Sequence, residues 1–275
     1  MLLADRLIEQ SHEPAEFARW PKFDVSNVAR YYLTHDKEYW VLGDFPLPHP
    51  PYDEMWCEYR MPPIVCSKGE GNWEVYLSGY TIYFGAIVYR KEDSFNICGM
   101  YYTVADQGRE KGKVKSFSEQ VSLRYWLDGS GTIEKSVLYS NKAEVKSPEE
   151  YATMAYCTHP ILMAFTFCNC KNAEVVTVRA SDALQKARAK RGVGKLHEHR
   201  IINILPFGKV FEGRRRTVVS DGKLAVEIRA GNYARYGPKF NRGLLFGKYE
   251  GLFWRPSILA GDKAVDYNIK LVGKT

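Results

Sequence analysis

The segment SPEEYATMAYCTHPILMAFTFCN, residues 147–169, decides the fold class of this chain. Ser147 is followed directly by Pro148 and, three positions after Ser147, by Glu150, which is a typical capped start of a helix. The residues after Glu150 are apolar nearly all round the helix that they would form, and a helix without a polar face has to be buried. We therefore predict a buried central helix at about 148–168.

The residues before this helix have the pattern of β-strands. Three segments are rich in Tyr, Val, Ile and Trp and are separated by Gly, Asp and Ser, namely 73–92, 95–105 and 120–127. In the last of them Val121, Leu123 and Tyr125 alternate with residues of the opposite face, which is the period of a half-buried strand. Asp-Gly-Ser-Gly at 128–131 then returns the chain into a further strand. The predicted fold class is α+β, a mostly antiparallel β-sheet packed on the buried apolar helix at about 148–168, with a small, β-rich, basic C-terminal module.

Residues 44–63 hold six prolines. Each proline removes a backbone hydrogen-bond donor and restricts the residue before it, so a regular helix is excluded here. We interpret the segment as an extended stretch in which Met55, Trp56 and Tyr59 dock onto the body of the protein.

The composition divides the chain into three parts. Residues 1–180 form the predicted α+β domain, with an acidic helical N-terminus in which residues 1–60 carry 11 Asp plus Glu against 6 Lys plus Arg. Residues 181–199 form a basic arm or linker. Residues 200–275 form the small β-rich module, where a hairpin is predicted around Asp221-Gly222.

No feature of the sequence predicts export or a membrane. Asp5 and Arg6 follow the first four residues at once, which leaves no room for an apolar leader. The longest apolar run, 154–167, is too short to span a bilayer. The six cysteines contain no Cys-x-x-Cys pair and fit reduced thiols. We therefore predict a cytoplasmic protein without membrane contact.

The positive charge of the chain is confined to one region. The chain carries a net charge of +7, whereas residues 179–248 hold 17 Lys plus Arg against 5 Asp plus Glu, a local charge of +12. Such asymmetry points to a polyanionic partner. The alternative is that the acidic N-terminal part packs against the basic region and neutralises it.

Lys and Arg neutralise phosphates, and the aromatic residues between them could stack on bases, so the basic region predicts contact with nucleic acid, either DNA or RNA. Aromatic residues at alternating strand positions would equally build a core. We predict no catalytic residue, cofactor or metal. The predicted nucleic-acid-binding residues are Lys186, Arg188, Lys190, Arg191, Lys195, Arg214, Arg215, Arg216, Arg235 and Lys248.

Two alternatives to simple binding stay open. The first is a nuclease-like enzyme, which would use His197 and His199 on one face of a strand, or the set Asp262, Asp266, Lys248 and Arg235. The second is a protein-binding role, in which the acidic residues 1–60 or the aromatic surface contact a host protein in takeover or counter-defence. The sequence does not fix an oligomeric state.

Six different short motifs lie along the chain. They are Pro50-Pro51-Tyr52 to Trp56, Asn169-Cys170-Lys171-Asn172 at the end of the apolar helix, Arg229 to Tyr236, Leu245-Phe246-Gly247-Lys248 to Gly251 and Trp254, Gly261-Asp262, and Asp266-Tyr267. Together with the basic stretch they resemble a family of uncharacterised proteins encoded by phages and prophages, over most of the chain.

The resemblance implies a phage-related origin and a mixed, β-rich fold, and it brings no established activity. One position departs from the family pattern. Asn232 stands where the Arg-Gly-His-Phe motif of the family has His. Since Asn does not titrate near neutral pH, an acid, base or ligand role of that histidine would be lost in this chain.

Overall fold

The computed structural model describes residues 2–10, 18–34, 42, 45–61, 80–106, 111–204, 227–229, 231–240, 243–245, 247–255 and 258–260. The chain divides into two compact units, Met1–Leu205 and Pro206–Thr275. This division differs from the predicted boundaries at 180 and 199, because strand β9 (His199–Ile204) pairs within the large sheet of the first unit. The predicted hairpin at Asp221-Gly222 lies outside the described residues.

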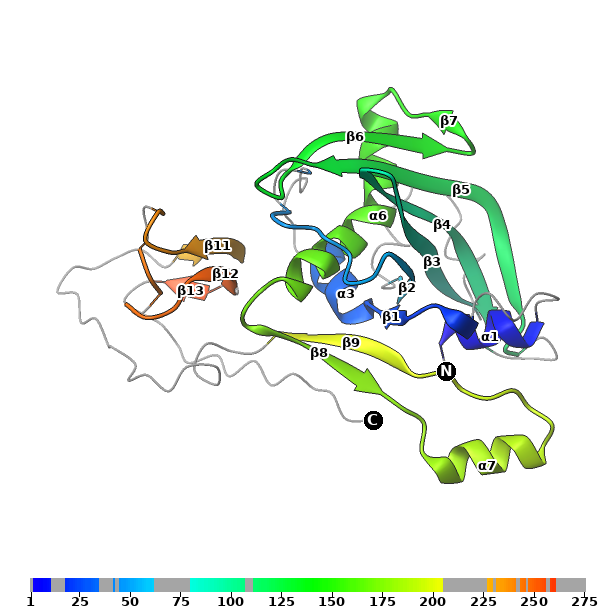
Figure 1. Ribbon diagram of the computed structural model, residues 1–275. Helices are drawn as coiled ribbons and strands as arrows, with labels where there is room; N and C mark the ends of the chain where they lie inside the picture. The colour runs from blue at the N-terminus through cyan, green and yellow to red at the C-terminus, as the bar shows by residue number, and fades with distance from the viewer. Residues whose placement is uncertain are drawn as a thin grey trace. The chain divides into compact units, whose positions relative to one another are not determined.

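A sheet with nine described strands dominates the first unit, in the order β7-β6-β5-β4-β3-β2-β1-β9-β8 (Figure 1). Strand β1 runs parallel to β2 and to β9, and the other neighbours pair antiparallel. The prediction of a mostly antiparallel α+β fold is therefore confirmed. Besides β9, the strands are β1 (Lys22–Asp24), β2 (Glu54–Arg60), β3 (Tyr80–Lys91), β4 (Ser94–Ala105), β5 (Val114–Leu127), β6 (Ile133–Ser140), β7 (Ala143–Glu144) and β8 (Ala173–Val178).

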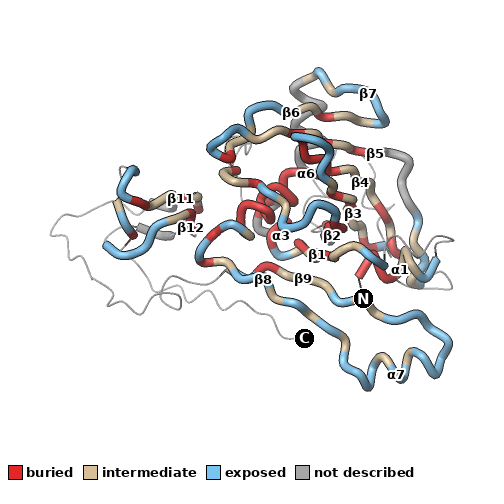
Figure 2. Tube along the Cα trace, viewed as in Figure 1, coloured by how far each residue is buried: buried red, intermediate tan, exposed pale blue. Residues whose placement is uncertain are grey.

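The predicted central helix is α6 (Pro148–Cys168), and from Cys157 onward it lies buried against one face of the sheet (Figure 2). Helix α3 (Ser26–Thr34) packs beside it. The hydroxyl of Tyr59 in β2 donates to the carbonyl of Cys157 over 3.0 Å, which ties sheet to helix. Among the residues that the structure describes, no helix is long and apolar enough to cross a membrane.

The face of the sheet that meets α6 is built by strict alternation. Val121, Leu123 and Tyr125 of β5 are all buried, as their period-two pattern predicts. Across the antiparallel register, Tyr59 of β2 lies opposite Phe84 of β3, and both are buried on this face. The hydrophobic burial of these side chains is the main stabilising term of the unit.

The opposite face of the sheet is covered at one end by helix α1 (Leu3–Gln10). Leu3 of α1 packs there with Trp56 of β2 and Tyr102 of β4. Strand β2 lies within the proline-rich stretch and is buried on both faces, so Met55, Trp56 and Tyr59 dock into the body as predicted.

The second unit contains two short antiparallel pairs among its described residues. Strand β10 (Glu227–Arg229) pairs with β13 (Ile258–Ala260), and β11 (Asn232–Tyr236) pairs with β12 (Gly251–Arg255). Tyr233 and Trp254 lie opposite each other across β11 and β12, with ring centroids 4.7 Å apart. The described residues between Asn232 and Arg255 therefore form strands and a small core around Leu245 and Phe253.

Candidate functional site

The site begins at one edge of the large sheet, where β8 and β9 are joined through helix α7 (Asp182–Lys190) (Figure 1). The side chain of Ser181 accepts a hydrogen bond from the amide of Leu184 and thereby caps the N-terminus of α7. No residue of α7 is buried, so this helix stands on the surface. The predicted basic arm is thus a helix and loop held between two paired strands.

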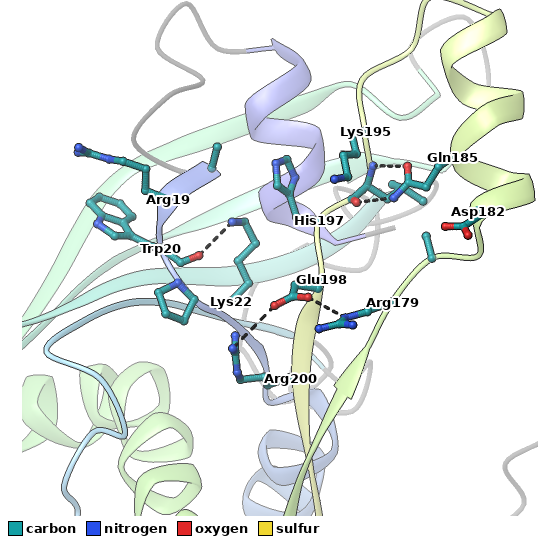
Figure 3. A pocket seen from close by; sticks show the side chains of 14 residues that line it. Arg19, Trp20, Lys22, Arg179, Asp182, Gln185, Lys195, His197, Glu198 and Arg200 are labelled. Carbon is teal, nitrogen blue, oxygen red and sulfur yellow. Dashed lines mark hydrogen bonds and ion pairs between the residues drawn. The ribbon is translucent and has the colours of Figure 1, made fainter.

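A pocket of about 500 Å³ lies between this arm and the segment that leads into β1 (Figure 3). Its size is that of a small-molecule site. Five cationic side chains line it against two carboxylates, which leaves a net positive charge. The charged residues of the lining are Arg19, Lys22, Arg179, Lys195 and Arg200 with Asp182 and Glu198, and Trp20 and His197 lie among them.

Part of this positive charge is used within the wall. Glu198 accepts a hydrogen bond from Arg179 over 2.8 Å and lies 3.9 Å from a guanidinium nitrogen of Arg200. The Arg200 guanidinium also lies over the rings of Phe23 and Tyr52, at 5.9 and 5.1 Å from their centroids. Arg200 is therefore held in the wall chiefly by the two rings, and Glu198 is held by its hydrogen bond from Arg179.

Two other cations are available to a ligand. Arg19 and Lys195 are both exposed, and within the described part of the chain neither side chain forms a hydrogen bond or an ion pair. Lys195 lies on the same side of the pocket as Arg179, whereas Arg19 lies beside Trp20 on the other side (Figure 3). A ligand that spans the pocket would meet positive charge at both ends.

Lys22 forms a buried part of the pocket wall. Its ammonium donates to the carbonyl of Trp20 over 3.1 Å. Burial lowers the pKa of Lys22, and the carboxylates of Asp5 and Glu58 oppose that effect. The indole Nε1 of Trp20 donates to Glu54 over 3.2 Å, so the ring contributes its apolar surface to the lining.

His197 is held by a buried carboxylate. Its backbone amide and its Nδ1 both lie 3.0 Å from Oδ1 of Asp5, a residue of α1 that is 3% exposed. The two contacts to one carboxylate oxygen fix the orientation of the imidazole ring in the pocket wall. Such an orientation suits an acid–base group as well as a structural one.

Arg188 is engaged inside the protein, although the sequence predicts it to contact phosphate. Its guanidinium donates to the carbonyl of Gly194 over 2.8 Å and pairs with Glu9 of α1. Gln185 and Leu196 exchange two further hydrogen bonds, of 2.7 and 3.1 Å. The sequence left open that the acidic N-terminal part packs against the basic region and neutralises it. The pair of Glu9 and Arg188 shows such packing for this part of the region.

The outward face of α7 is the opposite one. Since Gln185 and Arg188 face the protein, the helical period directs Ala183, Lys186 and Ala187 away from it, with Lys190 one turn further. The small side chain of Ala187, between the exposed Lys186 and Lys190, permits close approach of a phosphate backbone. Arg191, directly after the helix, is exposed as well.

The remaining predicted residues fall elsewhere. Arg214, Arg215, Arg216, Asp262 and Asp266 lie outside the described residues. Arg235, in β11, and the exposed Lys248 belong to the second unit. His199 lies opposite Val178 at the start of β9. In the described part of the chain no group of three or more His, Cys, Asp or Glu side chains could hold a metal ion.

Sequence reasoning missed Arg19, Trp20, Lys22, Arg179 and Arg200 as site residues. Four of them are charged, but they lie some 160 positions apart in two groups, and each group alone is unremarkable in composition. The signal that could have found them is the basic-aromatic pair Arg19-Trp20 in an otherwise acidic region.

Comparison of the chain with protein-family models, with curated proteins and with solved structures finds no match.

Proposed function

We propose that this protein binds nucleic acid without chemistry of its own, as a phage-related accessory protein of the host cytoplasm. Phosphates would contact the outward face of α7 and the rim of the pocket. The observation that supports this most is the segment 179–200, which holds seven Lys plus Arg against two carboxylates and exposes Lys186, Lys190, Arg191 and Lys195.

The available cations decide where binding would occur. Lys186, Lys190, Arg191 and Lys195 are exposed and close in sequence on one helix and the loop after it. Each phosphate contact releases counterions, so the affinity should fall steeply with salt. A role of Arg214 to Arg216, Arg235 and Lys248 is part of the proposal and is tested separately by their substitution.

The test is fluorescence anisotropy with single-stranded and duplex oligonucleotides that end in hydroxyl groups, at several salt concentrations. Replacing Lys186 and Lys190 by Ala should make the slope of log K against log salt less steep, by about 1.4 for single strands and about 1.8 for duplex. The matched control replaces two exposed lysines by Ala, Lys91 of β3 and Lys146 of the connection between β7 and α6. No binding at low salt, or the same slope in wild type and the α7 variant, would refute the proposal.

A nuclease-like activity is the second candidate, and the Asp5–His197 pair favours it. With Nδ1 bonded to Asp5, Nε2 of His197 could take a proton from water beside a bound phosphodiester. Incubation with labelled DNA and RNA, with Mg²⁺ or with a chelator, tests this. Cleavage that His197→Ala abolishes and His199→Ala retains would support it, and intact substrate in every condition would exclude it for those substrates.

A further inference from the structure

Resting on the proposed function, we propose that the pocket between α7 and the segment 18–22 binds a nucleoside monophosphate unit. The phosphate monoester would lie at Lys195 and Arg179, and the base would lie against Trp20. The source of this unit is either the phosphorylated end of a nucleic-acid strand or a free mononucleotide, since both carry the same chemical group.

The charge of the pocket favours a monoester over an internal phosphodiester. Five cations against two carboxylates leave an excess of three positive charges in the lining. A phosphate monoester carries about −1.5 to −2 charges at neutral pH, whereas an internal phosphodiester carries one. A terminal phosphate therefore gains more from this lining than the chain phosphates that follow it.

The shape of the pocket provides two different ends. Lys195 and Arg179 lie at one side, and Trp20 with Arg19 lies at the other (Figure 3). Because Nε1 of Trp20 is directed to Glu54, the indole is anchored and offers apolar ring surface to the pocket. A ring anchored in this way can stack on a base with little loss of side-chain freedom.

The contacts that each cation already makes within the protein decide which of them can bind the phosphate. Arg200 lies near Glu198 and over two aromatic rings, and Lys22 is buried. These two side chains therefore add to the positive electrostatic potential of the pocket without contacting the ligand directly. Lys195 forms no such contacts among the described residues. Arg179 bonds Glu198 through its Nε, and its side chain is 75% exposed, so its terminal nitrogens can still contact a phosphate. Lys195 is therefore the side chain whose loss should remove the most phosphate affinity with the least structural effect.

The binding test compares one oligonucleotide bearing a 5′-phosphate, a 3′-phosphate or hydroxyl ends, together with the four 5′-mononucleotides, by competition anisotropy and calorimetry. A phosphorylated end should bind about 10-fold more tightly than a hydroxyl end. Replacing Lys195 and Arg179 by Ala should abolish this ratio. The Lys91 and Lys146 control should keep it.

The base contact has its own variants. Trp20→Leu should weaken a mononucleotide about 10-fold and leave the affinity for inorganic phosphate unchanged, whereas Trp20→Phe should restore most of the loss. Equal affinity for all strand ends together with no mononucleotide binding would overturn the pocket proposal. So would a phosphate preference that survives the loss of Lys195 and Arg179.

The same measurements distinguish a failure of mononucleotide binding in the pocket from a failure of nucleic-acid binding on α7. If hydroxyl-ended strands bind through Lys186 and Lys190 but end phosphates add nothing, the pocket proposal falls and nucleic-acid binding stands. If mononucleotides bind through Lys195 and no strand of any kind binds, the pocket proposal holds with the free nucleotide as source, and nucleic-acid binding falls.

Discussion

Glu58 should make the stability of the first unit depend on pH in an unusual direction. Its carboxylate lies buried under the start of α1, where it accepts hydrogen bonds from the amides of Leu3 and Ala4 over 2.6 and 2.8 Å. The indole Nε1 of Trp56 donates to it over 2.7 Å. Burial is the largest influence, outweighs these donors and raises the pKa of Glu58 from 4.5 to about 7.

The sign of the effect follows from proton binding. Below pH 4.5 both states bind the proton, and between pH 4.5 and about 7 the folded state binds it while the unfolded state does not. The stability contributed by the protonated group is therefore fully present below pH 4.5 and is lost as the pH rises through about 7. At about 1.4 kcal/mol for each pH unit between the two pKa values, the loss is about 3 kcal/mol.

Glu58→Gln removes this titration and keeps the shape of the side chain. The free energy of unfolding of wild type minus that of Glu58→Gln should therefore fall by about 3 kcal/mol between pH 4.5 and 8. Taking this difference cancels the titration of groups that do not interact with Glu58. Urea unfolding followed by circular dichroism and tryptophan fluorescence, at half-unit pH steps, measures it.

The control for this experiment is Glu144→Gln, which removes an exposed carboxylate from β7. Its difference from wild type should stay flat over the same pH range. A difference for Glu58→Gln that is equally flat, or one that rises with pH, would refute the claim that burial dominates the pKa of Glu58.

Three further changes test the packing and the site. Gly99→Ala places a Cβ 2.5 Å from the ring of Phe84, so the free energy of unfolding should fall by about 1–3 kcal/mol, and an unchanged urea midpoint would contradict this packing. Tyr59→Phe leaves the carbonyl of Cys157 without its 3.0 Å donor and should cost about 1 kcal/mol in the same assay, with full stability as the contrary result. Ser181→Ala removes the N-cap of α7 at a cost of about 1 kcal/mol, so hydrogen exchange of the α7 amides should be about fivefold faster, while the amides of the sheet stay protected. Equal exchange rates of the α7 amides in wild type and variant would show that the cap contributes nothing.

The sequence predicts those parts of the fold whose information is local. The apolar run of α6 and the alternation of Val121, Leu123 and Tyr125 each reveal burial within one element, and both predictions are confirmed. The N-cap at Ser181 is also a local signal, since it needs only the amide of Leu184. Period and capping chemistry are properties of neighbouring residues, so one chain suffices to show them.

The site depends on information that is not local. Strand β1 has three residues, too few to show a period, yet it pairs in parallel with both β2 and β9. That pairing brings Arg19, Trp20 and Lys22 beside Lys195 and thereby forms the pocket. A short parallel strand inserted between distant segments has no local signature in the sequence. The sequence therefore predicts Lys195 on one wall of the pocket but not Arg19, Trp20 and Lys22 on the other.

The net charge of the basic segment does not show which of its cations are available to a ligand. The basic segment looks uniform in sequence, but Arg188 is paired with Glu9, and Arg179 and Arg200 with Glu198. Among the described cations of residues 179–200, the exposed ones without an ion pair are Lys186, Lys190, Arg191 and Lys195.

Helix α1 links the buried carboxylates to this surface. The amides of Leu3 and Ala4 donate to Glu58, and Asp5 contacts His197. Glu9 pairs with Arg188 in the last turn of α7. The acidic N-terminus therefore neutralises the inner face of the basic arm and fixes its position. The same contacts leave the outer face positive, so the packing alternative and the binding hypothesis, opposed when only the sequence is considered, are compatible in the folded unit.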